Sequence, residues 1–417
     1  MKAAIHDFTP CDLRYLGARL IAGGFLPLPF EPSSSLTLGA ELELQLLESG
    51  SNNLSSSSPK VLQLLGSTDS VKAELYQSMI EITTGICQNA QQIGGDFREA
   101  LAKLYTVCSK LNLSLASAGT HPYAQYENEI LYPDARYRRL LKKNQWLTRR
   151  LLIFGLHIHV GMRSGQHSIQ VANSLLHYTP LLLSLSASSP FCRSEDTQLA
   201  SARTSFFEAI PTAGQPCTFE CWSDFLTMYE KLKQSHAIDG PKDLWWDIRP
   251  NPSLGTIEIR VCDSPATIQE TEAIVALVHL LCQKIDQNLA LKGDSYPPPF
   301  WLLRENKWRA MNKGIDADLI VDTAGETKKM AEYLDKVLKD LSPLIEVNDY
   351  APQMETLRQI MAKGSSADRQ RSIYRQSSKN FHPVMDALID ELRTDKPKWI
   401  ESKTKKPNTQ KGGSECA

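Results

Sequence analysis

The 417-residue sequence has almost no excess of charge of either sign and no long apolar run. Its 46 Lys and Arg residues stand against 47 Asp and Glu, which gives a formal net charge of −1. A nucleic-acid clamp or an electrostatic membrane binder needs an excess of one sign, so we expect neither nucleic acid nor membrane as a partner. No stretch reaches the roughly 18 consecutive apolar residues of a spanning helix, and the segment that starts at Met1 lacks the cationic region of a secretory signal.

The sequence also lacks the short motifs of several common sites. No two of its nine cysteines have Cys-x-x-Cys spacing, so we expect small apolar fillers in a reducing, cytoplasmic compartment rather than a disulfide framework or a zinc site. There is no Gly-x-x-x-x-Gly-Lys-Ser/Thr loop, no Gly-x-Ser-x-Gly elbow and no Gly-x-Gly-x-x-Gly fingerprint. P-loop, serine-hydrolase and dinucleotide-binding sites are therefore not indicated.

The two ends of the chain differ in composition from the rest. Residues 1–35 hold an apolar stretch broken by glycine and proline and followed by a serine run, which predicts a loosely attached N-terminal extension. Residues 396–417 are rich in lysine, glycine, asparagine and serine, which predicts a flexible tail. Residues 36–395 are expected to form one domain, with a helical C-terminal part from about residue 320.

Within that domain, short alternating segments predict strands and longer segments with helical spacing predict helices. The predicted strands are residues 38–47, 79–84, 113–118, 153–160, 245–249 and 256–262. The predicted helices are residues 95–110, 168–188, 219–234, 267–291, 328–341 and 354–361, and nearly everything after Pro299 is expected to be helical. Because strands and helices do not alternate regularly, an α+β fold is favoured over a doubly wound sheet.

Four predicted strands combine a wholly apolar face with a face of acidic, imidazole or guanidinium groups. Residues two apart in a strand point to the same side, so each set below shares a face. The four polar faces carry Glu41, Glu43 and Gln45; Glu81 and Thr83; His157 and His159; and Glu258 and Arg260. Such faces either meet water, as is common for antiparallel sheets, or form a site.

The residue types on these faces favour a metal site over a solvated face. The three strands with the clearest pattern carry no lysine, and Glu41 and Glu43 lie about 7 Å apart, where cations between them would reduce their repulsion. Several carboxylates with one or two imidazoles suit Mg²⁺ or Mn²⁺ better than Zn²⁺. An ion-pair network is the alternative, since it also brings such groups together.

Arginines near these segments indicate an anionic ligand. Arg249, Arg203, Arg136 and Arg260 lie in or beside the predicted strands, and planar guanidinium groups bind phosphate and carboxylate by paired hydrogen bonds. For Arg136 and its basic neighbours an exposed helix face is an equally good interpretation. His121, in Gly-Thr-His-Pro, is either a loop ligand or a turn residue.

These segments resemble the carboxylate–amine ligase family, the type 2 glutamate–cysteine ligases of the glutamine-synthetase-like superfamily. Nine motifs, in order over about residues 36–320, carry the resemblance. They are Leu-Gly-Ala-Glu-Leu-Glu-Leu-Gln-Leu, the Glu74…Glu81 pair, Ala-Gly-Thr-His-Pro, Arg-Tyr-Arg-Arg-Leu, Phe-Gly-Leu-His-Ile-His-Val-Gly, Leu-Ser-Ala-Ser-Ser-Pro-Phe, Trp-Trp-Asp-Ile-Arg-Pro, Gly-Thr-Ile-Glu-Ile-Arg-Val and Glu-Asn-Lys-Trp-Arg-Ala.

The resemblance implies a curved, mainly antiparallel sheet that binds ATP and Mg²⁺ or Mn²⁺ on its concave face, with helices on its back. In such an enzyme ATP phosphorylates a carboxylate, and an amine then attacks the acyl phosphate. Residues 36–395 would form its single catalytic domain, a small acid and an amine would be its substrates, and a homodimer its assembly. The implied metal ligands are Glu41, Glu43, Glu74, Glu81, His157 and Glu258. The implied catalytic residues are Arg260 and Glu258, and the implied substrate- and ATP-binding residues are Arg249, Arg203, Arg136, His159 and Gln45.

Two other functions are compatible with the residues. One is a metal-dependent hydrolase in which His157 and His159 bind Zn²⁺ and Glu41 or Asp263 serves as the base. The other is a ligand-binding relative that keeps the fold without the chemistry.

Overall fold

The structure, a computed structural model, describes residues 28–33, 36–292 and 297–399. Most of the predicted extension and tail therefore lies outside the described residues. Where the extension is described, it follows the main body closely: Glu31 and Ser33 donate backbone hydrogen bonds to the carbonyls of Pro252 and Met162, at 2.9 and 2.8 Å.

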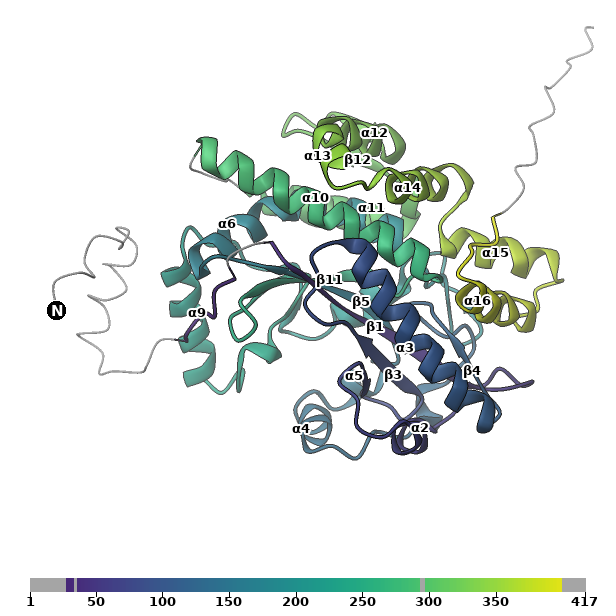
Figure 1. The fold of residues 1–417 in the computed structure, drawn as a ribbon. Helices are drawn as coiled ribbons and strands as arrows, with labels where there is room; N and C mark the ends of the chain where they lie inside the picture. Colours follow the sequence, from purple (N-terminus) through teal and green to yellow (C-terminus); the bar gives the residue numbers. More distant parts are fainter. Residues whose placement is uncertain (1–27, 34–35, 293–296, 400–417) are drawn as a thin grey trace, which may run out of the picture.

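A seven-stranded sheet forms the centre of the described chain, and all its strand pairs are antiparallel (Figure 1). The order is β10-β11-β5-β1-β3-β2, and β4 pairs with the second half of β1. The strands are β1 (Leu38–Glu48), β2 (Val71–Ala73), β3 (Met79–Thr83), β4 (Leu113–Ala116), β5 (Gly155–Gly161), β10 (Ile248–Asn251) and β11 (Thr256–Asp263).

The alternation of apolar residues in β1 explains its central place. Leu42, Leu44 and Leu46 are completely buried on one face, and the isoleucines of β3 and β11 join them there. Two long helices, α3 (Ala90–Lys110) and α10 (Ile268–Lys292), cover this apolar face and pack against each other (Figure 1). Their burial leaves the opposite, polar face of the sheet to form the site.

The other helices complete the layers around the sheet. They are α2 (Ser58–Leu65), α4 (Ala135–Asn144), α5 (Trp146–Arg149), α6 (Gly165–Leu175), α7 (Thr179–Ser186), α8 (Ala202–Phe207), α9 (Trp222–Gln234), α11 (Phe300–Lys313), α12 (Met330–Asp340), α13 (Ser342–Val347), α14 (Ala351–Lys363), α15 (Ser366–Gln376) and α16 (His382–Thr394). In Figure 1, α12 to α14 lie beyond α10, on the side away from the sheet. The predicted α+β fold, with a mainly antiparallel sheet and helices on its back, is confirmed.

Three details of the predicted elements are wrong. The single helix over 168–188 is two helices, α6 and α7, because Pro180 in the first turn of α7 has no N–H to continue α6. The strand over 245–249 is divided at Asp247 into β9 (Trp245–Trp246), which pairs with β8 (Ala213–Gly214), and β10. The helix predicted over 328–341 begins only at Met330, because residues 328 and 329 belong to β13 (Thr327–Lys329), which forms a hairpin with β12 (Asp318–Ile320).

Candidate active site

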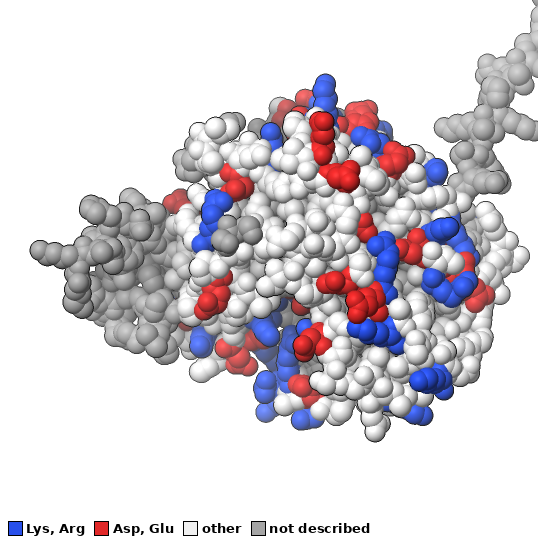
Figure 2. Space-filling view, in the orientation of Figure 1, with Lys and Arg blue, Asp and Glu red and all other residues white. Residues whose placement is uncertain are grey.

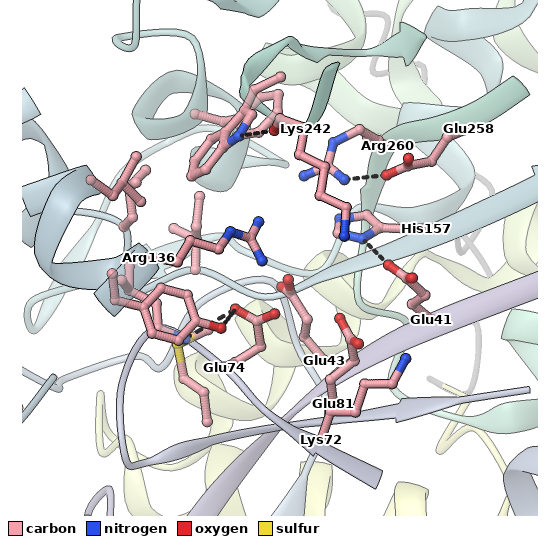
Figure 3. Close-up of a pocket in the computed structure, with 18 of the residues that line it drawn as sticks. Glu41, Glu43, Lys72, Glu74, Glu81, Arg136, His157, Lys242, Glu258 and Arg260 are labelled. Carbon is pink, nitrogen blue, oxygen red and sulfur yellow. Dashed lines mark hydrogen bonds and ion pairs between the residues drawn. The ribbon is translucent and has the colours of Figure 1, made fainter. Parts of the chain in front are cut away.

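The polar face of the sheet forms the floor of a cavity of about 270 Å³ (Figure 3). Helices α4 and α8 and the segment around Trp245 line its walls, so these strand faces are buried rather than solvated. The interpretation as an ordinary water-facing surface is therefore wrong. The predicted site residues that line the cavity are Glu41, Glu43, Glu74, Glu81, Arg136, His157, His159, Arg203, Arg249, Glu258 and Arg260.

Gln45 is the predicted site residue that does not line the cavity. It follows Glu43 on the same face of β1, but at this position β1 pairs with β4 rather than β5. Its side chain is completely buried, and its Nε2 donates a hydrogen bond to the carbonyl of Ala118 at 3.2 Å. The structure thus gives Gln45 a structural contact and no place in the cavity.

Strand register explains how the ligand groups meet. Glu41 lies opposite His157 across β1 and β5, Glu43 lies opposite Glu81 across β1 and β3, and His159 lies opposite Glu258 across β5 and β11. Side chains on directly opposite residues of an antiparallel pair are close neighbours. A single polar face of four strands therefore gathers acids that are as far apart in the sequence as residues 41 and 258.

These side chains form three groups, in each of which one potential ligand atom per residue lies within 4.8 Å of the others. The groups are Glu41, His159 and Glu258; Glu41, Glu81 and His157; and Glu43, Glu74 and Glu81. Glu41 belongs to the first and second groups, and Glu81 to the second and third. The three groups are thus connected in series through shared carboxylates.

The third group brings three carboxyl groups together without a basic partner among them, that of Glu81 buried and those of Glu43 and Glu74 half-buried. Burial raises the pKa of Glu43 to about 8, and the charge of Glu74 adds to the rise. Burial also raises the pKa of Glu74, and burial together with the charges of Glu41 and Glu74 raises the pKa of Glu81 well above its usual range. Such a set of hard oxygen donors favours a divalent cation, whose positive charge would stabilise the ionised carboxylates.

The second group contains a neutral imidazole. Burial, with the positive charge of Arg260, lowers the pKa of His157 to about 4. Its Nδ1 lies 3.1 Å from Oε2 of Glu41, where a neutral ring donates a hydrogen bond. Burial opposes the ionisation of Glu41, but the two neighbouring imidazoles outweigh it and hold its pKa below the usual range. Glu41 is therefore a carboxylate at neutral pH.

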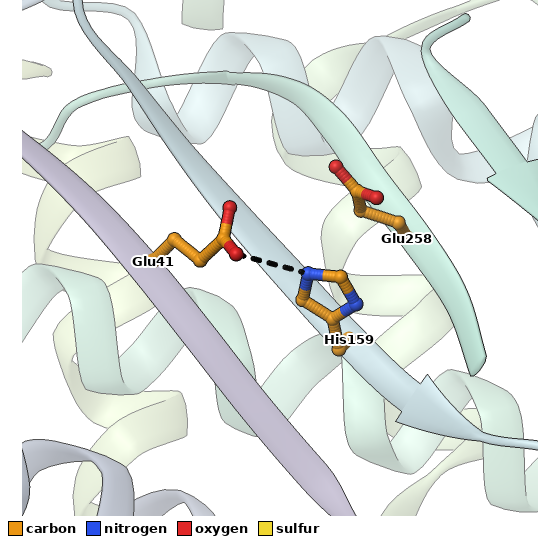
Figure 4. Close-up of side chains that lie close together, drawn as sticks. All are labelled: Glu41, His159 and Glu258. Carbon is orange, nitrogen blue, oxygen red and sulfur yellow. Dashed lines mark ion pairs between the residues drawn. The ribbon is translucent and has the colours of Figure 1, made fainter. Parts of the chain in front are cut away.

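The first group has a buried nitrogen without a hydrogen bond. The Nδ1 atom of His159 lies 3.0 Å from Oγ1 of Thr256, while its Nε2 has no hydrogen-bond partner in the described structure and faces Glu41 Oε1 at 3.7 Å (Figure 4). When Nδ1 donates to Thr256, Nε2 presents a lone pair to two acidic residues. That arrangement suits a cation between them, and Mg²⁺ or Mn²⁺ fits the oxygen-rich donors.

Glu258 is surrounded by hydrogen-bond donors. Nε of Arg249 donates to Oε2 at 2.9 Å and its Nη2 to Oε1 at 3.1 Å, while Asn251 donates to Oε2 at 3.2 Å and Arg260 donates to Oε1. Burial would raise the pKa of Glu258, but the charges of the two arginines lower it well below its usual range. Glu258 is therefore an ionised carboxylate held by two guanidinium groups.

Two guanidinium groups that line the cavity, one from α8 and one from β11, each have a buried nitrogen without a hydrogen bond in the described structure. The Nε atoms of Arg203 and Arg260 have no hydrogen-bond partner in the described part of the chain. Arg203 Nη2 donates to the carbonyl of Arg260 at 3.3 Å, and both guanidinium groups lie over the ring of Phe207. From the opposite wall, Arg136 of α4 points into the same cavity (Figure 3). These cations line the same cavity as the acidic groups and could contact an anionic ligand there.

Two residues considered from the sequence lie elsewhere. Asp263 is completely buried outside the cavity and accepts hydrogen bonds from Ser188 N, Ser189 Oγ and Ser201 Oγ, so it is not placed as a base. His121 is a turn residue: its Nδ1 accepts the backbone N–H of Ala124 at 3.1 Å. Neither supports the hydrolase.

The two histidines of the predicted zinc pair do not form a common group of potential metal ligands. In the described structure, no group of potential ligands contains both His157 and His159, although both imidazoles contact Glu41, one at each carboxylate oxygen. The zinc-hydrolase hypothesis is therefore not favoured.

Several lining residues were not predicted from the sequence. Lys72, in β2, lies opposite Glu81 of β3. Strand β2 has three residues and is too short to show an alternating pattern. Tyr137 stands next to Arg136 in the basic motif, which could have drawn attention to it. Lys242 lies in a turn without periodicity, and nothing in the sequence indicates that it lines the cavity.

A larger cavity of about 760 Å³ adjoins the first. In Figure 2, Lys and Arg side chains gather in a hollow of the surface just above α4. The cations that line the second cavity are Arg136, Arg139, Lys143, Lys242 and Arg249. The two cavities share a wall formed by Arg136, Leu140, Lys242, Trp245, Arg249 and Asn251.

The structure gives no indication of a membrane span. Within residues 28–33, 36–292 and 297–399, every helix is too short or too polar to cross a bilayer.

Solved structures with low sequence identity share this fold. A glutamate–cysteine ligase from Francisella tularensis, solved in complex with AMP, superimposes with a TM-score of 0.63 at 12% identity and covers 88% of this chain and 89% of its own. A bifunctional glutathione synthetase from Pasteurella multocida gives a TM-score of 0.61 at 14% identity, over 86% of this chain and 51% of its own.

Sequence relatives are much closer. A protein of Bdellovibrio bacteriovorus with the provisional name glutamate–cysteine ligase 2 is 39% identical over 370 residues, which cover 88% of this chain and 98% of that protein. A protein of Thermobifida fusca with the same provisional name is 37% identical over 395 residues, 93% of this chain and 98% of that one. The sequence profile of glutamate–cysteine ligase family 2 (GCS2) matches residues 37–386. The chain therefore belongs to glutamate–cysteine ligase family 2.

Proposed function

We propose that the protein is an ATP- and Mg²⁺-dependent carboxylate–amine ligase of the glutamate–cysteine type. The observation that supports it best is that three connected acidic groups share one small cavity with the guanidinium groups of Arg136, Arg203 and Arg260. Phosphoryl transfer is catalysed largely by positioning and by neutralising charge, which this arrangement is suited to do.

In the proposed reaction, a carboxylate oxygen of the acid attacks the γ-phosphorus of ATP and ADP leaves. The amine then attacks the carbonyl carbon of the acyl phosphate, inorganic phosphate leaves, and the new amide nitrogen loses a proton. This sequence needs no covalent protein nucleophile. Divalent cations bound by Glu41, Glu43, Glu74, Glu81, His157 and Glu258 would neutralise the charge of the phosphates.

The chain's own residues have three tasks in this scheme. Arg260 and Arg203 donate hydrogen bonds to the phosphoryl oxygens, where charge changes during transfer. Arg136 adds a cation from α4, and His159 adds a nitrogen ligand or a hydrogen-bonding group at the first acidic group. The rings of Tyr137, Phe207 and Trp245 in the walls reduce access of water to the acyl phosphate.

The test uses hydroxylamine, a small amine that traps acyl phosphates. The protein is incubated with ATP, Mg²⁺, hydroxylamine and a panel of amino and carboxylic acids beginning with glutamate, and hydroxamate and ADP are measured. Equal amounts of hydroxamate and ADP from one acid are expected. ATP binding without either product, for every acid in the panel, would instead indicate the ligand-binding relative that lacks the chemistry.

Three further expectations belong to this proposal. A cytoplasmic location is supported by the seven cysteines of the described residues, all of which are free. One catalytic domain over residues 36–395 would agree with limited proteolysis that removes only the two ends. A homodimer would give twice the mass of 46.6 kDa in sedimentation equilibrium.

A further inference from the structure

Lys242 is an exposed lysine that lies between the two cavities. Figure 3 shows its side chain extending from the upper part of the view into the first cavity. Among the described residues its ammonium group makes no ion pair. The lysine therefore presents a charge to the cavity that no protein carboxylate neutralises.

The backbone around Lys242 is held by several hydrogen bonds. The side chain of Asp243 accepts from the N–H groups of Asp239 and Gly240, at 2.6 and 3.2 Å. Nε1 of Trp245 donates to the carbonyl of Lys242 at 3.0 Å. The turn that carries the lysine thus has a defined conformation.

Arg249 connects this turn to the acidic floor. Its Nη1 donates to the carbonyls of Lys242 and Leu244, at 3.1 and 2.8 Å, and more weakly to that of Pro241 at 3.4 Å. Its Nε and Nη2 hold both oxygens of Glu258. The guanidinium group is buried and its donors are used within the protein, which leaves little capacity for direct contact with a ligand.

We propose that Lys242 binds the phosphate chain of the nucleotide where it passes between the two cavities, and that Arg249 is a positioning residue that fixes the Lys242 turn relative to Glu258. The inference rests on the proposed ligase function and assigns a further phosphate-binding residue to it. It also changes the role expected for Arg249 from direct contact with substrate or ATP to support of the turn.

The charge balance favours phosphate as the group that Lys242 contacts. The acidic groups are suited to cations, while Lys242, Arg203 and Arg260 add three basic side chains to the lining of the same cavity. An anionic ligand that shares bound cations with the carboxylates would therefore also have these basic side chains around it. A lysine ammonium can rotate its three donors to follow such a polyanion.

The test measures equilibrium binding of a fluorescent ATP analogue in the presence of Mg²⁺, so it does not depend on knowing the acid or the amine. Lys242→Met is expected to weaken binding about tenfold or more, because a charge-assisted contact is lost, and Lys242→Arg should restore most of it. Lys233→Met, at an exposed position on α9, serves as the control and should bind normally. Unchanged binding by Lys242→Met would overturn the inference.

Arg249 is tested by amide hydrogen exchange in the turn, because a general loss of stability would speed exchange in other elements as well. Arg249→Lys keeps a positive charge but cannot hold both Glu258 and the carbonyls of the turn. Amide hydrogen exchange of residues 239–244 should become faster in this variant, while exchange in α3 stays unchanged. Equal exchange in the turn with and without the substitution would contradict the positioning role.

The outcomes separate this inference from the proposed function. If the wild-type protein binds the Mg²⁺–ATP analogue and Lys242→Met binds it equally well, only the inference fails. If the wild-type protein does not bind the analogue at all, the ligase proposal fails and the inference, which rests on it, fails with it.

Discussion

Glu43 lies directly opposite Glu81 in the register of β1 and β3, so two acidic side chains occupy a pair of positions at which like charges destabilise a sheet. Both are held in the buried floor of the cavity. The pair is unfavourable for folding alone and favourable for holding cations. Stability and function should therefore respond to its removal in opposite directions.

Glu81→Gln tests that opposition. The variant should have an unchanged or higher melting temperature without metal, because one of two opposed carboxyl groups is removed, and it should lose the stabilisation that Mg²⁺ gives the wild type. Hydroxamate formation should fall at least about 100-fold, because Glu81 belongs to two of the three acidic groups. Differential scanning calorimetry with and without Mg²⁺ measures the first two effects. Glu99→Gln, which changes an exposed acid on α3, is the matched control, and a Glu81→Gln variant as active as this control would remove Glu81 from the metal site.

Gly155 provides space for a cavity arginine. A Cβ atom at this position would lie 2.2 Å from Nη2 of Arg203, which is buried and cannot move freely. Gly155→Ala should therefore displace the guanidinium group and lower kcat about tenfold or more, with a smaller change in the KM for ATP. The matched control is Gly95→Ala in α3, where a Cβ meets nothing within 4 Å. That change should leave kcat unchanged and raise the free energy of unfolding by about 0.5–1 kcal/mol.

His121 should make stability depend on pH. Its Nδ1 accepts two backbone N–H groups, so Nε2 must carry the proton that is donated to Asn52 O, and a second proton has no acceptor. Burial lowers the pKa of His121 to about 4. As the pH falls below about 6.5 the unfolded chain takes up this proton first, so stability that is present above pH 6.5 is lost as the pH approaches 4.

The size of the His121 contribution is at most about 3 kcal/mol, from the difference between the two pKa values. Urea unfolding of the wild type and of His121→Asn, at pH 7.5 and 4.5, measures it. The variant should be less stable than the wild type at pH 7.5 and should lose less stability on acidification. Parallel losses in the two proteins would assign the pH dependence to other groups.

Lys307 of α11 supports the strand that carries Arg260. Its ammonium group contacts Asp247 Oδ2 at 2.5 Å and also Glu208, and the carbonyl of Asp247 accepts the N–H of Arg260 at 2.7 Å. Lys307→Met leaves a buried carboxylate without its partner and should cost about 3–5 kcal/mol of unfolding free energy. Adding Asp247→Asn should recover part of that loss. The control Lys329→Met removes the exposed ion pair to Asp318 and should have little effect; an equally small effect of Lys307→Met would mean that Asp247 is neutral in the folded protein.

The central strands, whose side chains alternate between an apolar and a polar face, were predictable from the sequence. Alternation in β1 and β11 separated a leucine and isoleucine face from a polar face, and the same alternation selected Glu41, Glu43 and Glu258. Register was not predictable, because it is set by pairing between distant strands. The pairing of Glu43 with Glu81 therefore came only from the structure.

Other features left no periodic signal. Lys242 lies in a turn whose shape depends on a distant arginine, and Lys72 lies in a three-residue strand. The hairpin after Ile320 depends on Asp322, whose side chain accepts the N–H groups of Ala324 and Glu326 in the connecting turn. Asx turns of this kind involve only a few residues, and the helical spacing on both sides of this turn led to the prediction of helix.

The contacts of Glu258 have a consequence for the order in which ligands act. A carboxylate offers about four lone-pair directions, and Arg249, Asn251 and Arg260 already direct four donors at this one. Any cation that coordinates Glu258 must therefore take the place of one of these donors. Arg260 lines the cavity and makes one hydrogen bond to Glu258, whereas Arg249 makes two and also holds the Lys242 turn, so Arg260 is the guanidinium group that can be released at the lower cost. If Glu258 bound a cation, the guanidinium group of Arg260 would then be released from Glu258 and could contact the incoming phosphate.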